Sequence, residues 1–180
     1  MMISEQAKQG LNHIFTRAAS SSIVLDAADK IQIELLHGTA IKEEATDRLL
    51  VLTVASYVFR LIVIFHLKSD PATVRYFSRG NPDRILDEAI GEIGNLCCGA
   101  INRELGTHFL HMGMSTPYLL EGKCITFLQA LRPTCVSRYR ITINDEVSLN
   151  ATLCWSAYAP IDFKAEAPVV QEFTGELELF

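Results

Sequence analysis

The sequence predicts an α+β fold in which two long helices pack on a mostly antiparallel sheet. Two amphipathic helices are expected, near residues 3–20 and 83–105, because apolar side chains recur there at helical spacing. Each helix is followed by segments whose apolar residues are typical of strands. The order helix, strand, hairpin therefore occurs twice, which indicates an internal duplication.

Length and composition exclude several classes of protein. The 180 residues fit one domain, expected in residues 1–165, followed by an acidic tail in residues 166–180. Hydrophobic residues make up 49% of the chain, which excludes wholesale disorder, and the net charge of −5 argues against a nucleic-acid partner. We find no secretory signal, and the five cysteines form no C-x-x-C pair. These features predict a cytoplasmic protein with free thiols.

The first half is expected to begin with the helix of residues 3–20, with Ser4 as its N-cap. Residues 30–36 alternate between apolar and polar side chains, which predicts a half-buried strand. Residues 37–47 are polar and are expected to form a loop.

Residues 49–67 are mostly apolar and long enough to cross a bilayer. Arg60 stands near the centre of this run, where membrane insertion would cost about 2.5 to 3.5 kcal/mol. The run is also rich in Val, Ile and Phe, which favour strands. We therefore interpret it as a hairpin of two strands, 48–55 and 58–67, and expect no insertion into a membrane.

The second half repeats this order. Asn81 and Pro82 are expected to start the second long helix, and Gly106 is expected to end it. The remaining elements are predicted to be a short helix in residues 72–77, a strand in residues 124–131, and a hairpin of residues 135–143 and 147–158.

The helix of residues 83–105 separates its side chains into two stripes. The first is mostly apolar and suited to burial. The second is mostly polar and runs in steps of four and three residues through Glu88, Glu92, Asn95, Gly99 and Asn102. Glu92 and Asn95 are therefore expected side by side on an exposed ridge. The helix also contains Gly91, Gly94 and Gly99, which either permit close packing on the sheet or let another protein approach the ridge.

These residues resemble the signature of the CheC/CheX/FliY phosphatases of bacterial chemotaxis. That signature is Asp or Ser, three residues, Glu, two residues, Asn, and a Pro about 21 or 22 residues later. Glu92 and Asn95 match its central pair, and 21 residues separate Asn95 from Pro117. Gly99 matches a glycine that often follows the Asn by four. Glu88 stands where the signature has Asp or Ser.

The N-terminal helix contains a partial copy of the same pattern. Glu5, Gln9 and Asn12 have the same spacing, but no proline follows at the required distance. One complete motif is more similar to one-site CheX than to two-site CheC. The order of elements over residues 3–158 also matches the family. CheX-like proteins tend to be homodimers, so the resemblance implies a homodimer.

The resemblance implies a phosphatase that hydrolyses the aspartyl phosphate of a CheY-like receiver domain. Asn95 would position the attacking water, because a carboxamide accepts one hydrogen bond while donating others. Glu92 would pair with a cation of the receiver, and Glu88, Gly99 and Pro117 would support the site. No cofactor of its own is expected, since Mg²⁺ would be held by the receiver. The alternative is a non-catalytic receiver-binding adaptor or motor-switch-type module on the same fold.

Other groups of residues are weaker candidates for a site. Cys97, Cys98, His108 and His111 have the side chains of a metal site, and Cys98 with either histidine has those of a nucleophile and base. Adjacent cysteines point about 100° apart on a helix, and buried thiols are therefore favoured and no metal is expected. Trp155 is expected in the core.

Overall fold

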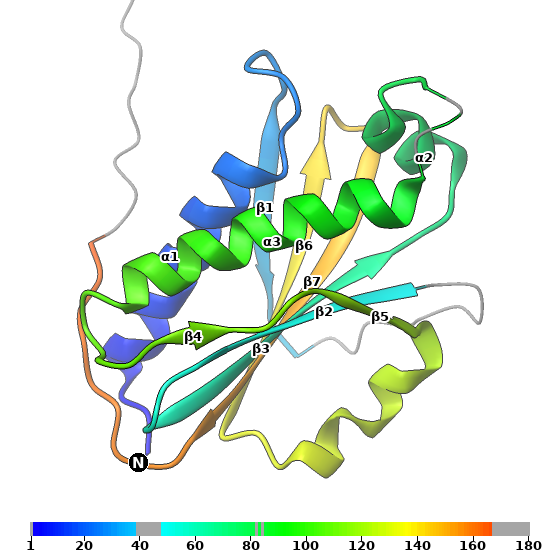
Figure 1. The fold of residues 1–180 in the computed structure, drawn as a ribbon. Coiled ribbons are helices and arrows are strands. Elements are labelled where there is room, and N and C mark those ends of the chain that lie inside the picture. The colour runs from blue at the N-terminus through cyan, green and yellow to red at the C-terminus, as the bar shows by residue number, and fades with distance from the viewer. Residues whose placement is uncertain (1, 39–47, 82, 84, 167–180) are drawn as a thin grey trace, which may run out of the picture.

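The structure is a computed structural model that describes residues 2–38, 48–81, 83 and 85–166. Its strands form one sheet of antiparallel pairs. The two long helices, α1 (Glu5–Ser22) and α3 (Leu86–Leu105), cross the same face of that sheet (Figure 1). The predicted α+β class is confirmed. Among the described residues, none of the helices combines the length and hydrophobicity needed to cross a bilayer.

The strand order shows the internal duplication. The strands are β1 (Ile31–Leu36), β2 (Arg48–Ala55), β3 (Phe59–Leu67), β4 (Gly113–Met114), β5 (Tyr118–Glu121), β6 (Cys135–Ile143) and β7 (Val147–Ala157). The sheet runs β1-β6-β7-β3-β2, and both β4 and β5 pair with β2 at its outer edge. Each half thus contributes a hairpin to the centre of the sheet. Each half also lends one strand, β1 or β5, to the hairpin of the other half.

The apolar run of residues 49–67 forms the β2–β3 hairpin, as predicted, with Ala55 opposite Arg60. Alternate residues of the hairpin point to opposite faces of the sheet. Leu50 and Leu52 join the core under the helices, whereas Val51 and Ile62 belong to a smaller apolar cluster on the other face. We call this other face, which neither long helix covers, the second face.

Caps and turns fix the ends of several elements, and the predicted cap of the first helix is confirmed. Ser4 caps α1, since its hydroxyl oxygen accepts a hydrogen bond from the amide of Ala7 at 3.0 Å. Asp70 caps the short helix α2 (Pro71–Ser78) in the same way. The β6–β7 hairpin turns at Asn144 and Asp145, which both have positive φ. Asn and Asp tolerate that conformation better than most residues.

The predicted strand of residues 124–131 is wrong. This segment lies within a 3₁₀ helix, η1 (Gly122–Leu131), which packs on the second face through Leu128. A short apolar run does not distinguish a strand from a buried helical turn, because both patterns place apolar side chains close together. The strand position in the second repeat is taken by β5 instead.

The second long helix begins later than predicted. The carboxamide oxygen of Asn81 accepts a hydrogen bond from the amide of Asp83, which forms a local turn, and α3 starts only at Leu86. Gly106 ends the helix as expected. Pro82, most of the loop expected in residues 37–47, and the acidic tail beyond Glu166 lie outside the described residues.

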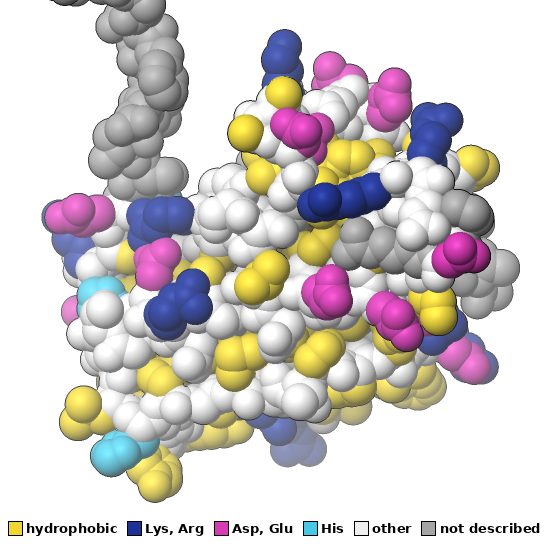
Figure 2. All heavy atoms as spheres, turned by 45° about the horizontal axis from the view of Figure 1, so that its top comes forward, with side chains coloured by type: hydrophobic (Ala, Val, Ile, Leu, Met, Phe, Trp, Pro, Cys, Tyr) yellow, Lys and Arg dark blue, Asp and Glu magenta, His cyan; other side chains and the backbone are white. Residues whose placement is uncertain are grey.

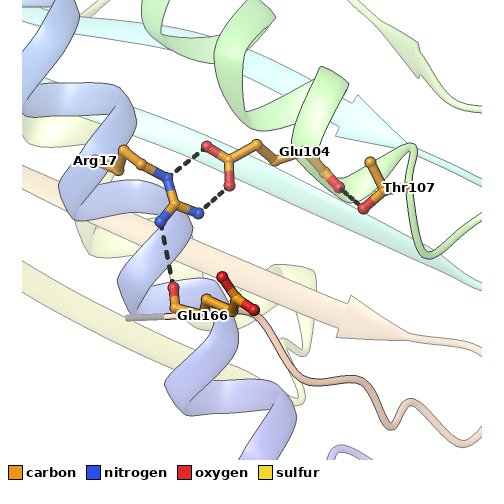
Figure 3. Close-up of polar contacts among 4 residues, drawn as sticks. All are labelled: Arg17, Glu104, Thr107 and Glu166. Carbon is orange, nitrogen blue, oxygen red and sulfur yellow. Dashed lines mark hydrogen bonds and ion pairs between the residues drawn. The ribbon is translucent and has the colours of Figure 1, made fainter. Parts of the chain in front are cut away.

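A pair of charged side chains joins the two long helices. Arg17 of α1 forms a bidentate ion pair with Glu104 of α3 and also donates to the backbone carbonyl of Glu166, at 3.2 Å (Figure 3). The hydrogen bond from Arg17 to Glu104 raises the pKa of the guanidinium. The ion pair explains how the Glu104 carboxylate fits between two helices.

Asp29 connects three parts of the fold. It accepts hydrogen bonds from the Tyr76 hydroxyl of α2, at 2.5 Å, and from the Asn144 side chain of the β6–β7 turn, at 2.7 Å. The amides of Leu25 and Asp26 also donate to it. These bonds lower the pKa of Asp29 to about 2, and burial together with the Asp29 bond raises the pKa of Tyr76 to about 12.

We expect Asp29→Asn to lower the thermal midpoint at pH 7. The folded-state pKa of Asp29 lies below its usual 3.8. Its contribution to stability is therefore present above about pH 4 and is lost as the pH falls towards about 2. The difference in thermal midpoint between wild type and variant should shrink over that interval. Asp145→Asn, which removes the charge of an exposed residue in the β6–β7 turn, is the control and should change little. A constant difference down to pH 2 would contradict this account of Asp29.

Candidate functional site

The polar stripe of α3 faces away from the sheet. Glu88, Glu92 and Asn95 are exposed, which confirms the predicted orientation of the central pair. The opposite side of the helix is buried, through Ala89, Ile90, Ile93, Gly94, Cys97, Cys98, Ile101 and Leu105. We call the surface formed by Glu88, Glu92 and Asn95 the α3 ridge.

The α3 ridge forms one wall of a cleft of about 560 Å³, which we call the α3 cleft. The opposite wall is the segment of residues 116–119, which contains Pro117 and leads into β5. Two parts of the motif that are more than twenty residues apart in sequence therefore meet at one site. Gly99 does not line the cleft. The lining residues are Leu50, Asp87, Glu88, Gly91, Glu92, Asn95, Thr116, Pro117, Tyr118 and Leu119.

The second wall of the cleft is held by the edge of the sheet. Ser115 and Thr53 are joined by two hydrogen bonds, from the Ser115 amide to the Thr53 carbonyl at 2.9 Å and from the Thr53 amide to the Ser115 hydroxyl at 3.0 Å. Pro117 then falls between β4 and β5, where the edge is not paired with β2. A proline is tolerated at such a position because it has no N–H to donate.

The three glycines of α3 serve different purposes. A Cβ at Gly94 would overlap the Cδ2 atom of Leu50 and lie 3.2 Å from Cδ1 of Leu52, so this glycine lets α3 lie close on β2. A Cβ at Gly91 would meet nothing within 4 Å, and one at Gly99 would meet only the tip of Arg103. Both explanations offered by the sequence therefore apply, close packing at Gly94 and open backbone at Gly91 and Gly99.

The α3 cleft has an acidic lining. Asp87, Glu88 and Glu92 all contribute to it, and Arg48 forms an ion pair with Asp87 at 3.2 Å. Both partners of that pair are partly exposed, so the pair contributes little stability. Figure 2 shows that acidic, basic and hydrophobic side chains are interspersed over the helix side of the molecule. The acidic lining is thus a local feature that suits a cation on a docking partner.

In the partial motif on α1, Glu5 and Gln9 are exposed but Asn12 is engaged by the chain itself. The Tyr139 hydroxyl donates a hydrogen bond to Asn12 Oδ1, which occupies the oxygen that would correspond to Asn95. Gly10 lies against Phe163, and the Ser4 hydroxyl donates to Asp162. The segment of residues 161–166 therefore packs over α1, whereas no comparable segment of the described chain covers the α3 ridge.

The alternative sites do not have the geometry that their chemistry requires. Cys97 and Cys98 are both buried, and burial raises the pKa of Cys98 to about 12, so this thiol is a poor nucleophile. His108 and His111 are exposed. The described part of the chain contains no cluster of three or more His, Cys, Asp or Glu side chains that could hold a metal. Trp155 lies in the core, as predicted.

Solved structures of chemotaxis proteins have a fold similar to that of this chain. CheX from Vibrio vulnificus matches with a TM-score of 0.57 at 13% sequence identity, over 81% of this chain and 99% of that chain. A CheX–CheY–BeF₃–Mg²⁺ complex from Borrelia burgdorferi contains a match with a TM-score of 0.59 at 15% identity, over 81% and 97%. FliY from Thermotoga maritima matches at 0.51 and 13% identity, over 86% and 92%. The chain has the CheC/CheX/FliY fold. No protein-family model and no curated protein matches the sequence.

Sequence reasoning missed part of the α3 cleft. Asp87, Thr116, Tyr118 and Leu119 line it but were not among the predicted site residues. Asp87 directly precedes Glu88, and the other three flank Pro117, so proximity to the motif was the available signal. Their side of the cleft depends on how β5 pairs with β2, a long-range contact that local patterns do not encode.

Alanine substitutions at two glycines should have opposite effects on stability. Gly91→Ala should raise the free energy of unfolding by about 0.5 to 1 kcal/mol, because it improves helix propensity in open space. Gly94→Ala gains the same propensity but must displace Leu50, and overpacking costs about 1 to 3 kcal/mol. The free energy of unfolding of Gly94→Ala should therefore be lower than that of wild type by about 1 kcal/mol. Urea unfolding of both variants tests this, and a Gly94→Ala protein as stable as Gly91→Ala would show that α3 does not depend on close contact at this point.

Proposed function

We propose that this chain is a CheX-like phosphatase that accelerates hydrolysis of the aspartyl phosphate on a CheY-like receiver domain. The observation that carries the proposal is the α3 cleft, which unites exposed Glu92 and Asn95 with Pro117 on the CheC/CheX/FliY fold. The Borrelia burgdorferi structure is a complex of CheX with CheY, BeF₃ and Mg²⁺. It supports a CheY-like partner for a protein of this fold.

The phosphatase needs to supply only a few groups for this reaction. An acyl phosphate is labile, and phosphoryl transfer is accelerated by positioning and by electrostatic stabilisation. The Asn95 carboxamide can accept a hydrogen bond from a water and hold it in line with the phosphorus. Glu92, three residues earlier on the ridge, can pair with a cation of the receiver. The receiver supplies the Mg²⁺, and no covalent enzyme intermediate is needed.

A receiver must come close to the helix for this to work. Gly91 leaves open backbone beside Glu92, and Leu96, which is 62% exposed, provides an apolar contact next to Asn95. The site is thus suited to a protein substrate rather than to an enclosed small molecule.

The second candidate is a receiver-binding adaptor or motor-switch-type module without catalysis. Glu88 favours it, because the family signature has Asp or Ser at this position. Glutamate is one methylene longer than Asp and carries a negative charge that Ser lacks. Such a protein would bind a phosphorylated receiver and leave its lifetime unchanged.

Asn95→Ala should reduce the acceleration of receiver dephosphorylation by roughly 10² to 10³, as expected for loss of one preorganised polar group. Glu92→Ala should act mainly on association and raise the half-saturating receiver concentration on the order of tenfold. The measurement is the decay of a phosphorylated receiver against protein concentration. Gln9→Ala, at the corresponding position of α1, is the control and should match wild type. Binding without acceleration by wild type, with Asn95→Ala equal to it, would establish the adaptor instead.

We also propose that the chain is a homodimer, which leaves the α3 ridge free. Support comes from the sheet, because among the described strands the outer strand β1 pairs with β6 alone. An unpaired strand edge is a template for a second chain. Light scattering should give about twice the 20.0 kDa mass of one chain. A mass of one chain at tens of micromolar protein would contradict the dimer.

A further inference from the structure

The second face of the sheet contains a groove of about 450 Å³, which we call the second-face groove. Its floor is formed by β2 and β3 and one side by η1 (Gly122–Leu131), well away from α1 and α3 (Figure 1). Apolar side chains dominate the lining, and Phe127 is 70% exposed. The lining residues are Leu49, Val51, Thr53, Arg60, Ile62, Ile64, Tyr118, Leu120, Cys124, Ile125, Phe127, Leu128 and Leu131.

Arg60 is the one charged residue among those that line this groove. It lies opposite Ala55 and Ser156 in the sheet, near the β2–β3 turn. Its Nε atom is enclosed, and within the described chain it has no hydrogen-bond acceptor. No carboxylate of the described residues forms an ion pair with Arg60. The partly buried guanidinium also lies near Cys154. Burial raises the pKa of the Cys154 thiol, and the positive charge of Arg60 opposes that rise.

An arginine in apolar surroundings is stabilised by a bound anion. Taking a charge out of water costs free energy unless a charge of opposite sign or a set of hydrogen bonds replaces the water. A guanidinium matches a carboxylate in particular, because it can donate two parallel hydrogen bonds. The groove therefore offers a polar end at Arg60 and an apolar floor that runs from Ile62 to Ile64 and Leu49.

We propose that the second-face groove binds an amphiphilic monocarboxylate, a linear apolar chain with one anionic end, with the carboxylate on Arg60. The volume lies in the range of small-molecule sites, which combine apolar walls with a few polar groups. From Arg60 to Ile64 the strand advances four residues, or about 13 Å, which suits a linear chain. This ligand is separate from the receiver, because the α3 ridge does not line the groove.

Calorimetric titration with octanoate, decanoate and 1-octanol tests the proposal. Wild type should bind one decanoate, about 15-fold more tightly than octanoate, because each buried CH₂ contributes about fourfold in affinity. Arg60→Gln should weaken decanoate binding by roughly tenfold or more and leave 1-octanol binding unchanged. Phe127→Ser, which alters an exposed residue at the groove, should weaken all three ligands.

Arg138→Gln is the matched control, since Arg138 lies on the same face of the sheet but outside the groove. It removes the same charge and should bind decanoate as wild type does. Circular dichroism would verify that each variant is folded. The proposal is overturned if wild type binds no decanoate, if both arginine variants lose equal affinity, or if Phe127→Ser abolishes self-association, which would make the groove an interface between two copies of the chain.

Discussion

The close contact between α3 and β2 at Gly94 is the constraint on which the candidate site depends. Without a side chain at this position, the helix rests on Leu50 and Leu52 and buries one stripe completely. The polar stripe must then point outward. Leu50 also forms part of the floor of the α3 cleft, so the packing of the helix and the shape of the cleft are set by the same contact. Gly94 thus lowers the helix propensity of α3 but allows the helix to lie close to β2.

The two halves of the molecule share a topology but differ in what their helices present. The helices α1 and α3 both lie on the same face of the sheet (Figure 1). On α1, the oxygen of Asn12 is used by Tyr139, and residues 161–166 pack against Gly10. On α3, Glu92 and Asn95 are exposed beside a cleft. Of the two copies of the motif, the one on α3 is therefore the copy whose Asn is exposed.

Much of the fold was predictable because local sequence patterns specify its elements. The alternation of residues 30–36, the apolar run divided at residues 55–58 and the stripes of α3 each specify an element with little help from distant contacts. The errors came where two structures fit the same pattern. The run Cys124–Leu131 suits a strand or a helical turn, and only its docking on the second face decides between them.

Part of the site was also predictable from a local pattern, the spacing of residues on one helix. One helix holds Glu88, Glu92 and Asn95, so their spacing indicates a shared ridge. The other wall of the cleft and the second-face groove are made by segments that meet only after the sheet forms. Tyr118 illustrates this, because it lines both the cleft and the groove. No pattern in the sequence around it indicates either role.

The most direct test of the account is to map where an activated receiver touches the chain. Isotope-edited NMR of the labelled chain, titrated with a receiver carrying a beryllofluoride phosphoryl analogue, reports this residue by residue. The account predicts that the amides of residues 88–99 and of Thr116, Tyr118 and Leu119 shift, and that those of residues 5–12 on α1 do not. Shifts centred on α1 or on the second face, with the α3 ridge unchanged, would contradict it.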